Sequence, residues 1–438
     1  MSAVRPAPAI EAAPPITPNL VREIPGARDI GRNTLETLLF RGLSTPVALL
    51  LVVVQGRFLH PSGRGAFVLA VLGVTILSRL LGQLGAAVTS RLREGDAELQ
   101  GLVQRALAVG AVLGTFGMGV VVAWAYASGD VGVRLAGIAA LALVPNLVWQ
   151  TISGVLLGRA RVRLWNYIQL LPPILTLAGM LVLVVILDAG VRGAVAAWAI
   201  ANALTAAFAL GAARDLWHPF GLPHVADRHA RLLVRLALLM GVVQVVNLIS
   251  YRIELYVLRR YEGLDEVGLY SIAMQAAEAM WLIPAAVATA LTAPALHETE
   301  ARAASLVARG AGRGTLFTAV VAVLVGASAP FVIPLIFGDA FEDAATPLLL
   351  LLPGIVVYAP VTVLVVYLSV RHGRPRLSLA VALVSLVVTT ALALVLIPRF
   401  GSGGAAVAST LGYACGSLLA WFFFVRMART AGRASAGG

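Results

Sequence analysis

The feature that most constrains the fold is a succession of apolar stretches, each long enough to cross a lipid bilayer. A membrane-spanning helix needs roughly 20 mostly apolar residues, and about twelve stretches of that kind follow one another here. Of the 438 residues, 59% are hydrophobic and 12% are charged, whereas a soluble domain has about 25% charged residues. The sequence therefore predicts an all-α integral membrane protein with about 12 transmembrane helices.

The predicted spans form two sets of six, joined by the longest polar break in the chain. The first set covers residues 34–56, 65–89, 104–127, 132–157, 164–187 and 191–213, and the second covers residues 231–258, 267–293, 314–336, 345–370, 377–398 and 402–426. We expect a proline-rich, disordered cytosolic tail at 1–33, an N-lobe at 34–213, a cytosolic linker at 214–230, a C-lobe at 231–427 and a second cytosolic tail at 428–438.

Arginine placement predicts the orientation. The chain has no lysine, so all 33 basic residues are arginines. If the N-terminus is cytosolic, 23 of them lie in or beside cytosolic segments, and 7, including Arg57, Arg64 and Arg259, lie on the other side. Short cytosolic loops of membrane proteins are enriched in arginine and lysine. Both termini are therefore predicted to be cytosolic, with the chain in the cytoplasmic (inner) membrane.

Composition also excludes several classes of site. The net charge of +12 is explained by topology, and no basic stripe or aromatic platform indicates nucleic acid binding. Cys415 is the one cysteine, so neither an intramolecular disulfide nor a thiolate metal cluster is expected. No phosphate-cradling loop with lysine and no soluble nucleotide-binding domain is seen. We expect no enzymatic activity, no metal site and no cofactor, and transport driven by an H⁺ or Na⁺ gradient or by the substrate's own gradient.

The two halves repeat three landmarks in the same order. Gly65-Ala66-Phe67 recurs as Gly268-Leu269-Tyr270, 203 residues later. The arginine pair that opens the stretch at 161 recurs 213 residues later at 374, and the glycine-rich stretch at 190 recurs 211 residues later at 401. Halves with an even number of spans insert in the same direction. We therefore predict two pseudo-symmetric six-helix lobes related by an axis along the membrane normal, as in transporters whose lobes rock about a central site.

Ionisable side chains inside the spans are costly, so each is a candidate for function. Arg41, Arg79 and Arg252 are predicted to bind a diphosphate, because arginine keeps its charge when buried and grips phosphate oxygens with a rigid fork of donors. Snorkelling toward the headgroups is the alternative for each arginine. Three acidic residues are candidates for charge balance or cation coupling, namely Glu36, Glu254 and Glu278.

Uncharged polar residues recur at helical spacing and are candidates to line a cavity. One group lies in the fourth predicted span and another in the seventh, and one residue lies a turn from Glu278 in the eighth. They are Asn146, Gln150, Gln244, Asn247, Tyr251 and Gln275. The alternative is that these side chains hydrogen-bond between helices and hold the bundle together.

Several short motifs resemble one family of transporters. Residues 266–273 read EVGLYSIA, and residues 251–254 read YRIE, with Glu254 where the family usually has aspartate. Residues 335–338 read LIFG and residues 397–401 read IPRFG. In order and spacing these are similar to the polysaccharide and oligosaccharide flippases of the multidrug/oligosaccharidyl-lipid/polysaccharide (MOP) exporter superfamily. The resemblance runs from about residue 34 to 426, and departs at Thr389-Thr390, where the family commonly has asparagine.

The resemblance implies a two-lobe flippase that moves an undecaprenyl-diphosphate-linked sugar between leaflets. Its expected partners are that substrate, membrane lipids and polysaccharide assembly proteins. In related lipid II flippases cavity arginines engage the diphosphate. Arg41 and Arg252 match such positions loosely, and Arg79 lies in a corresponding helix. Drug-exporting relatives carry an acidic residue in the first helix, a part that Glu36 would take.

Three alternatives stay open at this point. The first is a cation-coupled multidrug or organic-ion antiporter of the same fold, in which the glutamates matter more than the arginines. The second is a membrane-embedded sugar polymerase or ligase, although the external loops are short for one. The third is a component of a polysaccharide assembly complex that does not itself transport.

Overall fold

The structure is a computed structural model that describes residues 27–90, 96–218 and 227–436. Over these ranges the chain is helical, with no strand. The first half contains α1 (Ala27–Leu81), α2 (Leu84–Thr89), α3 (Asp96–Ser128), α4 (Val133–Ala140), α5 (Leu143–Gly158), α6 (Val162–Met180), the π-helix η2 (Leu181–Ile186), α7 (Gly190–Ala212) and η3 (Arg214–Leu216). The second half contains α8 (Arg228–Ile249), α9 (Ile253–Tyr261), α10 (Leu264–Ala279), α11 (Leu282–His297), α12 (Glu300–Phe337), η4 (Asp339–Ala344), α13 (Ala345–Val365), the π-helix η5 (Val366–Arg371) and α14 (Pro375–Ala436).

Ten helical segments in the described part are long and apolar enough to cross a membrane. Two of them are about twice the necessary length: residues 42–89 form 48 residues and residues 375–429 form 55. Each is interrupted by one non-helical residue, His60 (φ 54°, ψ 172°) in the first and Gly401 (φ 53°, ψ −134°) in the second. The protein is thus a multi-pass α-helical membrane protein.

Two predicted spans are broken where proline follows the break. The predicted span 132–157 divides between α4 and α5 at Leu141, and the predicted span 267–293 divides between α10 and α11 at Met280. Proline has no N–H, and its ring clashes with the carbonyl four residues earlier. Pro145 and Pro284 stand four residues after the two breaks, so each disrupts the helical hydrogen bonding at that point.

The predicted helix 231–258 is broken as well. It divides into α8 and α9 at Ser250–Arg252, where the Ser250 hydroxyl donates to the Asn247 carbonyl over 2.7 Å. The first predicted span also begins earlier than expected, because α1 starts at Ala27. Of the tail predicted at 1–33, residues 1–26 lie outside the described residues, and residues 27–33 belong to α1.

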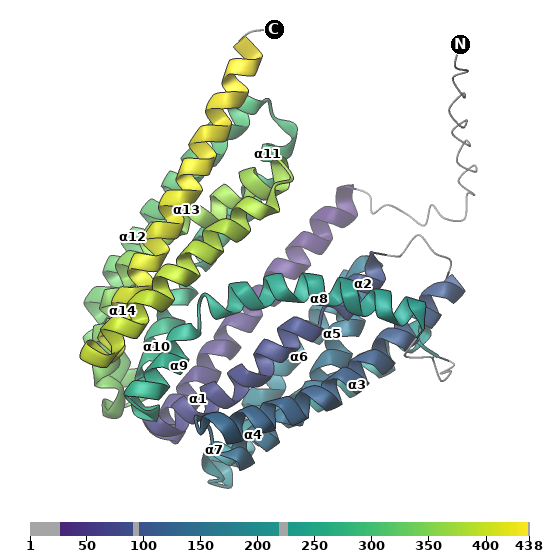
Figure 1. The fold of residues 1–438 in the computed structure, drawn as a ribbon, viewed down its shortest axis with the longest axis vertical. Coiled ribbons are helices and arrows are strands. Elements are labelled where there is room, and N and C mark those ends of the chain that lie inside the picture. Colours follow the sequence, from purple (N-terminus) through teal and green to yellow (C-terminus); the bar gives the residue numbers. More distant parts are fainter. Residues whose placement is uncertain (1–26, 91–95, 219–226, 437–438) are drawn as a thin grey trace, which may run out of the picture.

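Two groups of helices are visible in Figure 1, one built mainly from α1 to α7 and the other from α9 to α14. The beginning of α1 and the end of α14 lie at the same end of the molecule. Helix α8, which we expected in the C-lobe, packs against α1, α2 and α3. Its Gly241 is so close to α1 that an added Cβ would lie 2.0 Å from the Leu80 carbonyl oxygen.

Left-handed backbone conformations recur between the halves and extend the repeat seen in the sequence. Eight of the nine described residues with positive φ fall into four pairs that keep the same order along each half. The pairs are His60 with Gly263, Gly129 with Gly338, Ala160 with Gly373 and Gly190 with Gly401. Their separations are 203, 209, 213 and 211 residues. The chain therefore reverses direction in the same way at four corresponding positions.

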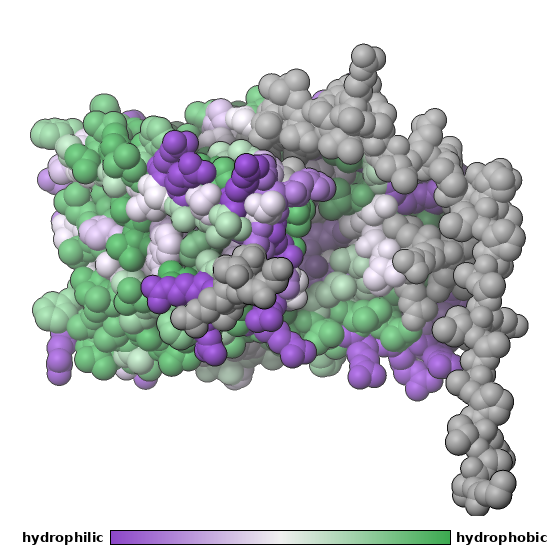
Figure 2. Space-filling model, turned by 90° about the horizontal axis from the view of Figure 1, so that it is seen from above, coloured by the Kyte–Doolittle hydropathy of each residue, from purple (hydrophilic) through white to green (hydrophobic). Residues whose placement is uncertain are grey.

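Apolar side chains cover much of the outside. Phe116, Phe331 and Leu335 are each more than 70% exposed, which in a membrane protein places them against lipid tails. Seen from the end where α1 begins and α14 ends, hydrophobic residues cover most of the outer sides. Hydrophilic residues gather toward the middle and around a hollow (Figure 2).

Candidate functional site

Arg252 and Glu278 form a two-pronged ion pair at the break between α8 and α9. Arg252 Nη2 lies 2.8 Å from Glu278 Oε2, and Arg252 Nη1 donates to Glu278 Oε1 and, over 2.8 Å, to the Tyr251 carbonyl. About a fifth of each side chain is exposed, 23% for Arg252 and 19% for Glu278. This geometry neutralises both charges inside the membrane. Arg252 is therefore occupied by a carboxylate in this state.

Four aromatic rings cluster beside this ion pair. Tyr251, Trp281, Tyr358 and Tyr413 come from four separate parts of the chain, and every ring contacts the other three, with centroids 5.1 to 6.4 Å apart. The Tyr251 and Tyr358 hydroxyls lie 3.4 Å apart. Aromatic clusters of this kind are rigid, with flat faces and polar edges. Tyr251 is the one of these four that was predicted from the sequence to line a cavity.

Glu254 is buried deep in the second half. It is 1% exposed, and the Ser409 hydroxyl of α14 donates to its Oε1. Tyr270 Oη lies 3.1 Å from the same Ser409 hydroxyl. Glu254 Oε2 has no hydrogen-bond partner among the described residues. A carboxyl group so poorly satisfied favours a bound proton or cation.

The helix that departs from the family pattern is nevertheless polar inside. Ser385 and Thr389, both on the first part of α14, are buried, and Ser385 donates to the Gly412 carbonyl over 2.8 Å. The Thr389 hydroxyl oxygen is also without a partner in the described part of the chain. Gly412 lets the two parts of α14 pack closely, since an added Cβ there would lie 1.9 Å from Thr389 Oγ1.

In the first half, amide side chains form a separate network. Asn146 Nδ2 and Trp149 Nε1 donate to Asn202 Oδ1 on α7 over 2.9 and 3.0 Å. Gln150 donates to Asn146 Oδ1. The spacing of Asn146 and Gln150 was visible in the sequence, whereas Asn202 was not singled out, because the network joins distant helices. Here the polar residues hydrogen-bond between helices, which was the alternative reading.

The three arginines predicted to bind diphosphate do not meet at one point. Arg79 lies in the last turn of α1 and is exposed, not deeply buried as the span prediction implied. Helix α1 ends at Leu81, two residues after Arg79, and α2 continues the same apolar segment to Thr89, the predicted end of the span. Arg41 belongs to α1 by its backbone, but its side chain lies outside the described residues. Of the two arginines whose side chains are described, Arg252 is bound to an acidic residue and Arg79 is not.

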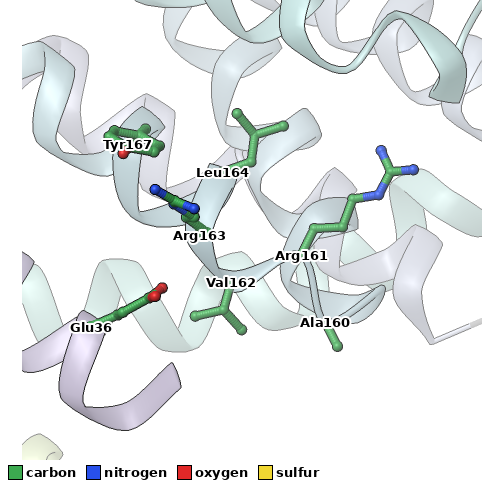
Figure 3. A pocket seen from close by; sticks show the side chains of 7 residues that line it. All are labelled: Glu36, Ala160, Arg161, Val162, Arg163, Leu164 and Tyr167. Carbon is green, nitrogen blue, oxygen red and sulfur yellow. The ribbon is translucent and has the colours of Figure 1, made fainter. Parts of the chain in front are cut away.

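Glu36 lies near the beginning of α1 and faces the start of α6 across a pocket of about 520 Å³. Arg161 and Arg163 lie on the α6 side of this pocket, and Glu36 lies on the other (Figure 3). The wall also contains Ala160, Val162, Leu164 and Tyr167. Of the three remaining candidates, Gln275 on α10 accepts a hydrogen bond from Arg64 over 2.7 Å. Gln244 and Asn247 lie on α8 and are exposed and half-buried respectively.

Charged residues outside the spans tie connecting segments together. Arg161 Nη1 and Nη2 lie 3.0 and 2.6 Å from the two carboxylate oxygens of Asp215. These hydrogen bonds are the main cause that lowers the pKa of Asp215 and raises the pKa of Arg161. Asp227 accepts from the Ala230 N–H over 2.7 Å as the N-cap of α8 and pairs with Arg105 of α3 at 2.8 Å. The Ala230 N–H is the main cause that lowers the pKa of Asp227.

One functional candidate was missed by the sequence analysis. Arg64 was counted with the arginines outside the membrane, yet its side chain is 0% exposed, in the middle of α1. The error came from reading 57–64 as a loop, whereas the helix resumes at once after His60 and carries Arg64 into the packed interior. In the described part of the chain, no group of three or more His, Cys, Asp or Glu residues is placed to hold a metal ion.

Comparison with known proteins supports the fold. A lipid II flippase, MurJ, in its inward closed conformation aligns with a TM-score of 0.78 and 10% identity, covering 90% of each chain. An inward-facing multidrug resistance transporter of the MATE family aligns with a TM-score of 0.74 and 15% identity, covering 89% of this chain and 96% of the other. This chain has the fold of the MOP superfamily.

The likeness to the MOP superfamily that the motifs predicted is thereby confirmed at the level of an all-helical, MOP-like fold. An outward-facing MATE transporter aligns less well, with a TM-score of 0.56 and 14% identity over 92% of this chain and 96% of that one. The helix arrangement is therefore closer to the inward-facing form than to the outward-facing form of that family. No family model and no curated protein sequence matches the chain.

Proposed function

We propose that this protein is a MOP transporter that flips a lipid-diphosphate-linked oligosaccharide or polysaccharide precursor from the cytosolic to the outer leaflet of the cytoplasmic membrane. The observation that carries the proposal is the charge inside the spans. Among the described residues, the buried or half-buried Arg64 and Arg252 are matched in number by Glu254 and Glu278, and Arg79, exposed in the last turn of α1, is a further cation for which the described residues provide no acidic partner. A substrate that brings a diphosphate supplies the missing negative charge.

The proposed topology has twelve spans in two six-helix lobes, with both termini in the cytosol. The breaks at His60 and Gly401 divide the two longest segments into two spans each. The shared end of α1 and α14 agrees with an even number of crossings. On this topology the hollow in Figure 2 faces the cytosol, where a lipid-linked precursor would enter.

The ion pair provides a means of exchange at the site. With no substrate bound, Glu278 neutralises Arg252. A diphosphate is recognised by guanidinium through the same pair of parallel N–H donors that now hold Glu278. Binding therefore displaces Glu278, and the neighbouring aromatic cluster offers flat faces beside the headgroup. Arg79, exposed on α1, is a second cation in the other half, which the headgroup meets at a separate point.

We assign cation coupling to Glu254. Its burial and the free Oε2 atom favour uptake of H⁺ or Na⁺. The same carboxyl supports the second candidate function, a cation-coupled multidrug antiporter, because such a transporter needs an acidic residue inside the membrane. The two functions differ in substrate charge, since an organic cation gains nothing from Arg79.

The test is transport of a fluorescent undecaprenyl-diphosphate sugar in proteoliposomes. Arg79→Gln should lower the flipping rate about tenfold or more, because a hydrogen bond to a charged group contributes roughly 1.5–3 kcal/mol. The matched control is Arg376→Gln, which removes an exposed arginine at the start of α14 and should leave flipping unchanged. If Arg79→Gln flips the lipid at the wild-type rate, the cationic-site proposal is wrong.

A further inference from the structure

The two halves meet through a reciprocal glycine contact. An added Cβ on Gly65 of α1 would lie 2.1 Å from the Leu264 carbonyl oxygen, and one on Gly268 of α10 would lie 2.0 Å from the Pro61 carbonyl oxygen. Gly65 and Gly268 are 203 residues apart, and so are Pro61 and Leu264. The contact is thus symmetric between the halves. The backbones are in close contact, because neither glycine leaves space for even a methyl group. We call this contact, between residues 61–65 of α1 and 264–268 of α10, the seal.

Two arginines brace this seal in matching ways. Arg57 of α1 donates through Nε to the Ile336 carbonyl over 2.8 Å and through Nη2 to the Leu335 carbonyl, at the C-terminal end of α12. Arg259 of α9 donates through Nε to the Asp130 carbonyl over 2.7 Å, just past the end of α3. Each arginine therefore reaches from one half to carbonyls at a helix end in the other. Helices α9, α10 and the adjoining part of α1 lie away from the end where α1 begins (Figure 1).

Arg64 lies inside this seal without an acidic partner among the described residues. Its Nε donates to Ser271 Oγ over 2.8 Å, its Nη1 to Gln55 Oε1 over 2.8 Å, and its Nη2 to Gln275 Oε1 over 2.7 Å. All three acceptors are neutral. Ser271 and Gln275 belong to α10, in the other half, and Gln55 belongs to α1.

A buried charge without a counter-ion is unfavourable even when it is hydrogen-bonded. The closed seal therefore encloses the positively charged Arg64 side chain, and no acidic residue among those described neutralises it. When the halves separate at this end, Arg64 loses two of its three acceptors and becomes accessible from outside. An anion that binds it there has no access in the closed form, so its binding shifts the equilibrium toward the open form, more strongly as its concentration rises above its Kd.

We propose that Arg64 is an anion-binding residue of the outward-open transporter, specific for phosphate or diphosphate groups and stored in the closed seal by Gln55, Ser271 and Gln275. This inference rests on the proposed function, since it gives the diphosphate a binding partner at the exit. It would draw the headgroup outward as the seal opens, and the seal would close again on Arg64 after release.

The test measures opening of the seal without any lipid substrate. Val267→Cys is introduced with Cys415→Ser, and a membrane-impermeant thiol reagent is applied to right-side-out vesicles. Val267, which precedes Gly268 on α10, is 0% exposed, so labelling reports opening. Inorganic diphosphate added outside should raise the labelling rate by on the order of tenfold, the change that about 1.4 kcal/mol of differential binding gives. Chloride at equal ionic strength should not.

Three variants make the result decisive. Arg64→Gln should abolish the response to diphosphate, whereas the matched control Arg260→Gln should retain it, because Arg260 is exposed on α9 and takes no part in the seal. Gln275→Glu supplies the missing carboxylate, so it should slow labelling and also abolish the response. Three results would overturn the inference. The first is a diphosphate response that persists in Arg64→Gln, and the second is a labelling rate in Gln275→Glu equal to that of the parent protein. The third is a parent protein that does not respond to diphosphate although Gln275→Glu slows its labelling.

The outcome is separable from the test of the proposed function. If diphosphate has no effect on labelling but lipid flipping is normal, the proposal for Arg64 is wrong and the proposed function stands. A normal diphosphate response without lipid flipping removes the proposed substrate and leaves the anion site in place.

Discussion

The ion pair between Arg252 and Glu278 gives a quantitative prediction. Replacing Glu278 by leucine leaves the guanidinium with the Tyr251 carbonyl and the Met274 sulfur, at 2.8 and 3.2 Å, as its remaining partners. Removing one member of a fully buried pair costs about 3–5 kcal/mol. Because about a fifth of each side chain is exposed (23% and 19%), water relieves part of this cost. We expect Glu278→Leu to destabilise the protein by about 2–3 kcal/mol, and Arg252→Met to have a similar effect.

The double variant Arg252→Met/Glu278→Leu should behave differently. Replacing both charges by apolar groups of similar size is often neutral or stabilising, so its stability should return to within about 1 kcal/mol of the wild type. The assay is reversible denaturation in detergent, with all four proteins of the double-mutant cycle measured together. If the double variant is as unstable as the sum of the single variants, the two side chains are not energetically coupled and the reasoning is refuted.

The same double variant separates stability from transport. It folds as well as the wild type but lacks the guanidinium that is proposed to bind diphosphate. We therefore expect stable protein with flipping reduced at least tenfold, the effect of losing about 1.4 kcal/mol of substrate interaction. Normal flipping by this variant would show that Arg252 has only a structural role.

Three further predictions follow from single sites. Ala160 holds a φ of 56°, so Ala160→Gly should raise stability by about 0.5–1 kcal/mol in thermal denaturation, and a loss would contradict the strain argument. The pKa of Asp215 is lowered by Arg161, so the stability from this pair is present above the ordinary carboxyl pKa and is lost as pH falls through the lowered value. Asp215→Asn should therefore make the free energy of unfolding less dependent on pH below about pH 4. An unchanged pH dependence would contradict this prediction. Glu254→Gln should make flipping in proteoliposomes insensitive to imposed H⁺ or Na⁺ gradients, whereas retained gradient dependence would remove Glu254 from coupling.

The sequence predicted the helices well, because hydropathy is a local property and a bilayer demands long apolar runs. The breaks at Leu141 and Met280 also had a local signal in Pro145 and Pro284. The reversal at His60 misled the prediction instead. A charged stretch between two apolar runs resembles an exposed loop, but here the helix resumes immediately and buries Arg64.

Contacts between distant elements were beyond sequence reasoning. The repeat identified Gly65 and Gly268 as equivalent, but equivalence did not reveal that they pack against each other across the halves. A signal for Arg64 did exist, since it stands directly before the repeated glycine. In the same way, Trp281, Tyr358 and Tyr413 join Tyr251 only through the tertiary packing of three further elements.

The central claim is that the substrate is an anionic lipid. The most direct measurement places the purified wild-type protein in proteoliposomes with a labelled undecaprenyl-diphosphate sugar and, separately, a fluorescent organic cation. We expect protein-dependent flipping of the lipid, slowed about tenfold or more in Arg79→Gln, and no uptake of the cation. Gradient-driven movement of the cation that requires Glu254, with no movement of the lipid, would contradict it.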